Sequence, residues 1–222
     1  MIFAAGEKKF LRQLFSCVQK EGINMHTLYI FQAESRHHIP HGKDSNYLIQ
    51  SCARDFLEDT AVPEKQTDFT IRRTREGKPE FLSAPLYFSI SHSGSVWYCL
   101  ISDILCGLDV QQNENRDFQR IARRFFLPEE QELVRAGGGT AFFRIWTRKE
   151  SLGKLLGRGM FQAFPLPVLT DSEEYSFQNI AIPGFDGSCA FCFQGIEEAG
   201  RPVNIKTIDP TGRCVQAAEI KE

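Results

Sequence analysis

Two short motifs hold acidic and amide side chains at spacings that could bind a small hard cation. In a strand, GLDVQ at 107–111 would place Asp109 and Gln111 on one face, roughly 7 Å apart at the backbone. Leu108 and Val110 would then point into the core. Carboxylate and amide oxygens suit such a cation. A simpler interpretation is that Asp109 ends an edge strand and contacts only water, and this motif alone leaves both open.

The second motif, WTRKES at 146–151, continues into LGKLLGRG, and a helix would separate Glu150 from Lys154 by one turn. That spacing is also typical of a surface ion pair, which contributes only a few tenths of a kcal/mol. Two glycines in the same short helix favour a packing or functional reason, because each costs about 1 kcal/mol relative to alanine. Lys149, Lys154 and Arg158 place three cations near one acid, as phosphate binding with a metal would need.

Three further stretches could contact an anion. SISHSG at 89–94 sets small hydroxyl side chains beside His92, which can donate to a phosphate, although the histidine could be structural and the serines turn formers. Its HSGS segment lacks the G-x-S-x-G spacing of a hydrolase nucleophile elbow. EGKPEF at 76–81 and the basic RHHIPHGK at 36–43 predict either solvated turns or phosphate contacts.

Hydrophobic periodicity predicts the elements that must position these motifs. Helices are expected at 46–58, 115–126, 128–136 and 141–156, the last two joined by the flexible AGGGT at 136–140. Strands are expected at 68–74, repeatedly within 86–110, and at 175–182, 189–196 and 201–209. Helices followed by strands, twice over, predict an α+β fold in two similar halves joined near 103–107.

Composition limits the function classes. A chain of 222 residues with 42% hydrophobic and 24% charged residues is typical of a soluble globular protein, and its net charge of −2 gives no general attraction to nucleic acid or anionic membranes. The charged N-terminus, MIFAAGEKKF, has neither a signal peptide's apolar core nor the length to span a bilayer, so we expect a cytoplasmic protein. The seven cysteines are expected to be reduced thiols rather than a metal site.

Taken in order, five motifs resemble the 4'-phosphopantetheinyl transferase superfamily, of the surfactin-synthetase-activating type. They are GKP at 77–79, SISHSG at 89–94, GLDVQ at 107–111, RRFF at 123–126 and WTRKESLGK at 146–154. The resemblance implies two pseudo-symmetric halves, each a small antiparallel sheet packed with helices, with the active cleft between them. Residues 1–104 would form the coenzyme A side and residues 105–222 the metal and catalytic side. The enzyme would transfer 4'-phosphopantetheine from coenzyme A to a serine of an apo acyl or peptidyl carrier protein, with Mg²⁺, and release 3',5'-ADP.

The resemblance also implies roles for individual residues. Asp109, Glu150 and Gln111 match the metal ligands, and Glu150 also matches a proposed general base. Asp109, Glu150 and Lys154 would form the catalytic group. The coenzyme A contacts would be Lys43, Lys78, Ser91, His92, Lys149 and Lys154. The pathway could be fatty acid, polyketide or nonribosomal peptide synthesis, and one chain with both halves needs no partner subunit, so we expect a monomer.

Two departures from the family pattern favour an alternative. Many relatives have a carboxylate where this chain has Gln111, and an amide is a weaker, neutral ligand. The usual dense basic run for the 3'-phosphate is reduced to Arg36, His37, His38, His41 and Lys43. The alternative is a catalytically weakened module that binds coenzyme A or the carrier. A third hypothesis is an unrelated hydrolase that uses His92 and a serine. The predicted helix at 115–126 carries a group of arginines, which are expected to form either a solvated face or a surface for an acidic carrier. They are Arg116, Arg120, Arg123 and Arg124.

Overall fold

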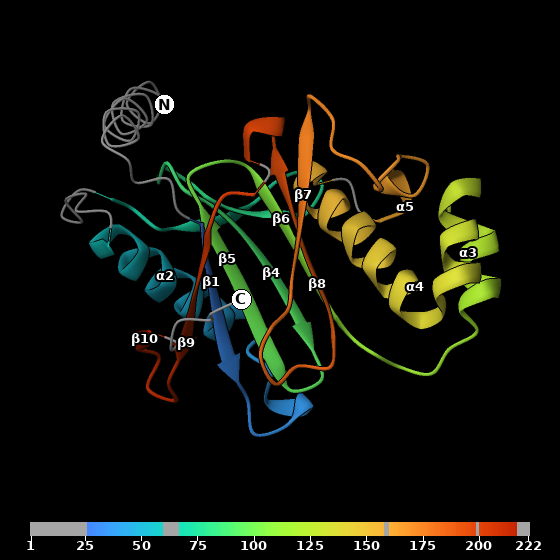
Figure 1. The fold of residues 1–222 in the computed structure, drawn as a ribbon. Helices are drawn as coiled ribbons and strands as arrows, with labels where there is room; N and C mark the ends of the chain where they lie inside the picture. The colour runs from blue at the N-terminus through green and yellow to red at the C-terminus, as the bar shows by residue number, and fades with distance from the viewer. Residues whose placement is uncertain (1–25, 60–66, 158–159, 199, 217–222) are drawn as a thin grey trace. The chain divides into compact units, whose positions relative to one another are not determined.

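The computed structural model describes residues 26–59, 67–157, 160–198 and 200–216, and Arg158 lies outside them (Figure 1). In chain order the elements are β1 (His26–Gln32), η1 (Arg36–His38), α2 (Gly42–Asp59), β2 (Ile71–Arg73), β3 (Pro79–Phe81), β4 (Tyr87–Ser93), β5 (Val96–Ser102), β6 (Cys106–Gln112), α3 (Phe118–Phe125), α4 (Pro128–Leu156), α5 (Met160–Ala163), β7 (Tyr175–Ile180), β8 (Gly187–Gln194), η3 (Ile196–Glu198), β9 (Val203–Ile208) and β10 (Cys214–Gln216). Helices packed with several small sheets confirm the expected α+β class.

The chain divides into two compact units. The first comprises the described residues up to Phe88, then 96–104 and those from Arg201 onward; the second comprises 89–95 and 105–200. The expected division into residues 1–104 and 105–222 stays a prediction. The C-terminal strand β9 belongs to the first unit because it pairs in parallel with β1, from His26 opposite Val203 to Phe31 opposite Ile208. The pseudo-symmetry of the halves stays a prediction.

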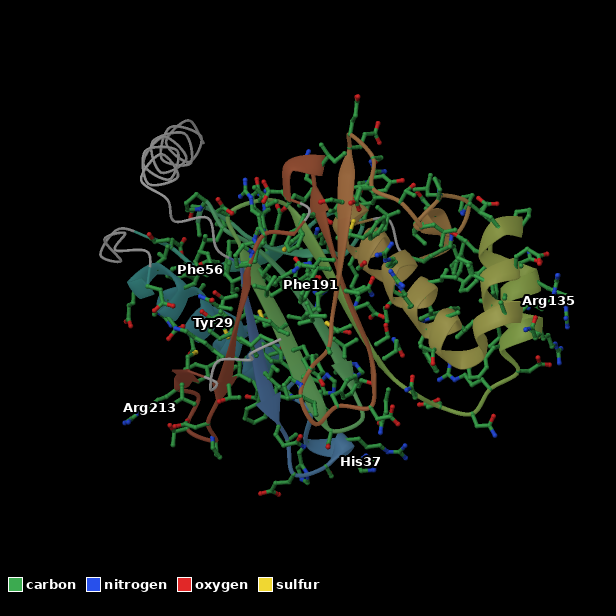
Figure 2. All side chains as sticks on the ribbon, viewed as in Figure 1. Tyr29, His37, Phe56, Arg135, Phe191 and Arg213 are labelled. Atoms are coloured by element: carbon green, nitrogen blue, oxygen red, sulfur yellow. The ribbon has the colours of Figure 1, made fainter. Side chains whose placement is uncertain are left out.

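The first unit is built on a sheet of strand order β10-β9-β1-β5-β4, of which residues 89–93 of β4 are counted with the second unit. Helix α2 lies on one face of this sheet, and Figure 2 labels Tyr29 on β1 and Phe56 on α2, both buried. The Tyr29 hydroxyl donates to Asp55 of α2 at 2.8 Å, and the Lys206 ammonium of β9 donates to the same carboxylate at 2.6 Å. These bonds attach α2 to two neighbouring strands. A separate hairpin, β2–β3, turns at Gly77, whose φ of 89° favours glycine.

The second unit is built on an antiparallel sheet of order β6-β8-β7, and Figure 1 shows α4 beside it with α3 packed on α4. Gly107 permits this packing, since a Cβ there would lie 2.8 Å from the Leu155 backbone nitrogen and still closer to the Ser151 carbonyl. Figure 2 labels Phe191, buried within this unit, and Arg135, which projects from its surface. The aromatic core on the helical side includes Phe126, Phe142, Phe143, Phe164 and Phe177.

Helix α4 joins the two helices that were expected on either side of AGGGT. It runs from Pro128 to Leu156, and its one non-helical residue is Gly138, with φ 60° and ψ −139°. The expected flexible connection is therefore a kink of a single residue, and the chain resumes its helix at once. The helix ends where Gly157 takes a left-handed conformation with φ 67°, as glycine does at helix C-termini.

The six cysteines within the described residues are free thiols, and Cys17 lies outside those residues. Five of the six are buried and Cys214 is partly exposed. None of the helices in the described part of the chain combines the length and the apolar character needed to cross a membrane.

Candidate active site

The serines of SISHSG support the open edge of β6. Their hydroxyls accept hydrogen bonds from alternate backbone N–H groups: Leu108 donates to Ser89 at 2.9 Å, Val110 to Ser91 at 3.2 Å and Gln112 to Ser93 at 2.7 Å. The other edge of β6 pairs with β8. The hydroxyls thus satisfy donors that a sheet edge would leave unpaired. The sequence already held the signal for this role, since serines at alternate positions share one face of a strand.

Asp109 is buried among three donors, with 2% of the residue exposed. Its Oδ1 accepts from Ser91 Oγ at 3.0 Å and Lys154 Nζ at 2.9 Å. Its Oδ2 accepts from Gln111 Nε2 at 3.1 Å, so the expected sharing of a strand face by Asp109 and Gln111 is confirmed. Burying a carboxylate without such partners would be very costly. The alternative in which Asp109 contacts only water is therefore wrong.

Glu150 lies on the turn of α4 that faces this carboxylate. The pKa of Glu150 is raised from 4.5 to about 7, mainly by burial and then by the charge of Asp109, while the charge of Lys154 opposes both. The charges of Asp109 and Lys154 both act on Glu150, so the three groups lie near one another. A carboxyl group that titrates near neutral pH is suited to accept a proton under physiological conditions.

Lys154 joins α4 to the edge of β6. Its ammonium donates to the Leu108 carbonyl at 2.8 Å and to Asp109 Oδ1 at 2.9 Å. An ammonium has three donors, so these two bonds leave one for another partner. The lysine side chain is 31% exposed, whereas that of Asp109 is 3% exposed. Lys154 is consequently the lysine of WTRKESLGK that the structure brings close to Asp109 and Glu150.

Lys149 lies apart from this group, although the sequence placed it among the phosphate contacts. Its ammonium pairs with Glu130 Oε2 at 2.8 Å, and neither side chain is exposed. It also donates to the carbonyls of Phe164 at 2.9 Å and Leu166 at 2.8 Å. Three contacts match the three donors of an ammonium. The structure therefore gives Lys149 a packing role, and we leave it out of the proposed site.

The remaining predicted contacts are more dispersed. His92 is exposed, and strand alternation directs its side chain to the face of β4 opposite Ser91. Lys78 follows the Gly77 turn and is half-buried, while Lys43 is exposed in the first turn of α2. Both lysines belong to the first unit, so their place in the site stays a prediction.

The donor set fits magnesium better than a metal that needs many protein ligands. Within the described ranges, no group of three or more histidine, cysteine, aspartate or glutamate side chains could hold a metal ion. Magnesium is usually held by one or two carboxylates, with waters and substrate phosphates completing its shell. Asp109 and Glu150 supply two carboxylates, and Gln111 could offer its carbonyl if the amide turned over.

Arg148 is a positioning residue that the motif did not predict. Its Nε donates to Asn179 of β7 at 2.6 Å and one terminal nitrogen donates to the Val168 carbonyl at 2.9 Å, while the guanidinium lies 5.3 Å from the centre of the Phe177 ring. It attaches α4 to the sheet two residues before Glu150. No pattern in the sequence predicted this role, because all three partners are distant along the chain.

Comparison with known proteins points to one family. Residues 105–201 match the model of the 4'-phosphopantetheinyl transferase superfamily. The chain is 35% identical over 94 residues to the 4'-phosphopantetheinyl transferase gsp of Aneurinibacillus migulanus, covering 40% of this chain and 39% of that protein. It is 33% identical over 113 residues to HetI of Nostoc sp., covering 46% and 48%. For AcpT of Salmonella typhimurium the identity is 37% over 94 residues, covering 39% and 49%. The chain thus spans less than half the length of each of these relatives.

Proposed function

We propose that this chain, whose residues 105–201 match the model of the 4'-phosphopantetheinyl transferase superfamily, is a holo-carrier-protein synthase. It transfers the 4'-phosphopantetheine arm of coenzyme A to a serine hydroxyl of an apo acyl or peptidyl carrier protein and releases 3',5'-ADP. The observation that carries the proposal is the grouping of Asp109, Glu150 and Lys154 within the matched residues. Two acids and a partly exposed lysine are what a transfer from a diphosphate requires.

The residues of this group have separate tasks in the proposed reaction. Glu150 accepts the proton of the carrier serine, directly or through a water. Lys154 uses its remaining donor on the diphosphate and stabilises the negative charge that develops on the departing 3',5'-ADP. In the free protein, Asp109 accepts a hydrogen bond from Lys154 and so fixes the lysine.

Asp109 and Glu150 would hold Mg²⁺, with Gln111 as a neutral third ligand. When bound, the metal would neutralise diphosphate charge and polarise the phosphorus under attack. Because Gln111 carries no charge, we expect weaker metal affinity than a site with three carboxylates would have.

The two substrates would approach different groups. The proposed contacts of coenzyme A are Lys43, Lys78, Ser91 and His92. The hydroxyl of Ser91 already donates to Asp109 and accepts from the Val110 N–H, so Ser91 would act mainly by holding that acid. For the carrier we propose the exposed arginines of α3 and the segment before it: Arg116, Arg120, Arg123 and Arg124. Their charge complements an acidic partner. We also propose that the protein is cytoplasmic and works as a monomer.

The test is transfer measured by intact mass. The purified chain is incubated with coenzyme A, Mg²⁺ and an apo carrier domain, and the carrier should gain one phosphopantetheine. Omitting coenzyme A, adding a chelator or replacing the acceptor serine by alanine should each abolish the gain. A carrier left unmodified in the complete mixture would instead support the binding module. Cleavage activity that needs no coenzyme A and continues with chelator would support the hydrolase.

A further inference from the structure

We propose that Lys154 is a resident cation that occupies the metal-binding face of Asp109, so that a divalent ion binds only by displacing it. The inference rests on the proposed function, because that function gives Asp109 its metal. It concerns the free protein and adds a step that precedes transfer. Lys154 then has two roles. In the free protein its ammonium keeps the metal from binding Asp109, and during transfer it binds the diphosphate.

The contacts of Asp109 carry this inference. Its Oδ1 already receives the Lys154 ammonium at 2.9 Å and the Ser91 hydroxyl at 3.0 Å. The carboxylate is almost wholly buried, with 3% of its side chain exposed, so an incoming ion finds few other approaches. Two cations on one buried oxygen repel each other strongly, since the surroundings screen them less than water does. Metal and ammonium therefore compete for the same atom.

Lys154 is able to leave, and its neighbour in the motif is not. The Lys154 side chain is 31% exposed and has a flexible four-carbon stem, so its ammonium can turn to water or to a phosphate. Lys149 shows no exposure and has its ammonium surrounded by Glu130 and two carbonyls. Of the two lysines of WTRKESLGK, only Lys154 is placed to exchange partners.

Asp109 would keep its orientation after the lysine leaves. The Ser91 hydroxyl still donates to Oδ1 and the Gln111 amide still donates to Oδ2 at 3.1 Å. Both donors are neutral, so they hold the carboxylate without opposing a metal by charge. The lysine loses one anionic partner in this exchange, and a diphosphate would supply another. Binding of metal and binding of the diphosphate should therefore assist each other.

The test measures Mn²⁺ binding to the free protein by calorimetry, with no coenzyme A or carrier present. We expect Lys154→Met to bind Mn²⁺ more tightly than the wild type, on the order of three- to tenfold, because the competing cation is gone. Arg144→Gln removes one charge from an exposed position of the same helix and is the matched control, with little expected change. Asp109→Asn introduced into the Lys154→Met protein should abolish the gain, which locates it at this carboxylate.

Equal or weaker Mn²⁺ binding by Lys154→Met would overturn the inference, and so would an absence of binding in every variant. Lys154→Gln serves as the second variant, and thermal unfolding verifies that each protein is folded. The result is independent of turnover. If Lys154→Met shows the affinity gain but the wild type leaves the carrier unmodified, the proposed function alone is wrong. If the wild type transfers but Lys154→Met shows no gain, only this inference is wrong.

Discussion

Lys149 and Glu130 form an ion pair of 2.8 Å in which neither side chain is exposed to solvent. The same carboxylate oxygen accepts the Leu127 N–H at 2.9 Å, which caps the start of α4. The lysine therefore connects the first turn of α4 to the turn that carries Glu150 and, through the Phe164 and Leu166 carbonyls, to the segment after α5. Burial lowers the pKa of Lys149, and its hydrogen bond with Glu130 opposes that effect.

Removing one partner of this pair should destabilise the fold. We expect Lys149→Met to lower the free energy of unfolding by about 3–5 kcal/mol, because Glu130 is left as a buried charge without its cation. The double variant Lys149→Met, Glu130→Leu should recover part of that loss. Chemical unfolding monitored by circular dichroism measures both. A single variant as stable as the wild type would contradict the packing role of Lys149.

Gly107 should not accept a side chain. In Gly107→Ala the new methyl would meet the Leu155 backbone nitrogen at 2.8 Å and come closer still to the Ser151 carbonyl. Because both are backbone atoms of α4, the helix itself must shift, and we expect a loss of about 1–3 kcal/mol. Transfer should fall as well, since the shift separates Glu150 from Asp109. Unfolding curves and initial rates measure the two effects, and unchanged values for both would show that β6 and α4 pack more loosely than described.

The pH dependence of stability should reveal the buried acid. The folded pKa of Glu150 is about 7, above its ordinary value of 4.5. As pH rises from about 4.5 to 7, the unfolded chain releases a proton that the folded protein keeps, so this group lowers stability over that window and the loss is complete above it.

At pH 8 the free energy of unfolding of Glu150→Gln should therefore exceed that of the wild type by about 1 kcal/mol or more, after allowing for partial exposure. The variant should then also unfold at a higher temperature, whereas near pH 4.5 the two proteins should be equally stable. It should also lose transfer. Paired thermal scans across this range provide the measurement. A difference that shrinks with rising pH would contradict the sign.

Gln111→Glu should restore a third carboxylate to the site. We expect the variant to keep transfer and to need less Mg²⁺ for half-maximal rate, because an anionic ligand binds this ion more tightly than an amide. In the metal-free protein the new charge should raise the pKa of Glu150 further. Initial rates across a Mg²⁺ titration provide the measurement, with Gln112→Glu as a neighbouring control on the same strand. Loss of transfer in Gln111→Glu alone would show that the Gln111–Asp109 hydrogen bond is itself required.

The local periodicities of the sequence determined which side chains share a face. Alternation in GLDVQ placed Asp109 with Gln111, and their hydrogen bond confirms it. The start of one helix at Pro128 and the interruption in AGGGT were also predictable, because proline and glycine act on the backbone beside them.

Only the tertiary structure decided which partner each charged side chain meets. Lys149 and Lys154 belong to one motif and carry the same charge, yet one is buried against Glu130 and the other bonds Asp109, because five residues of helix turn them toward different elements. The pairing of β9 with β1 was equally hidden, since 177 residues separate His26 from Val203. Contacts between distant segments depend on how whole elements pack, and the periodicity of one segment carries no information about the surface it will face.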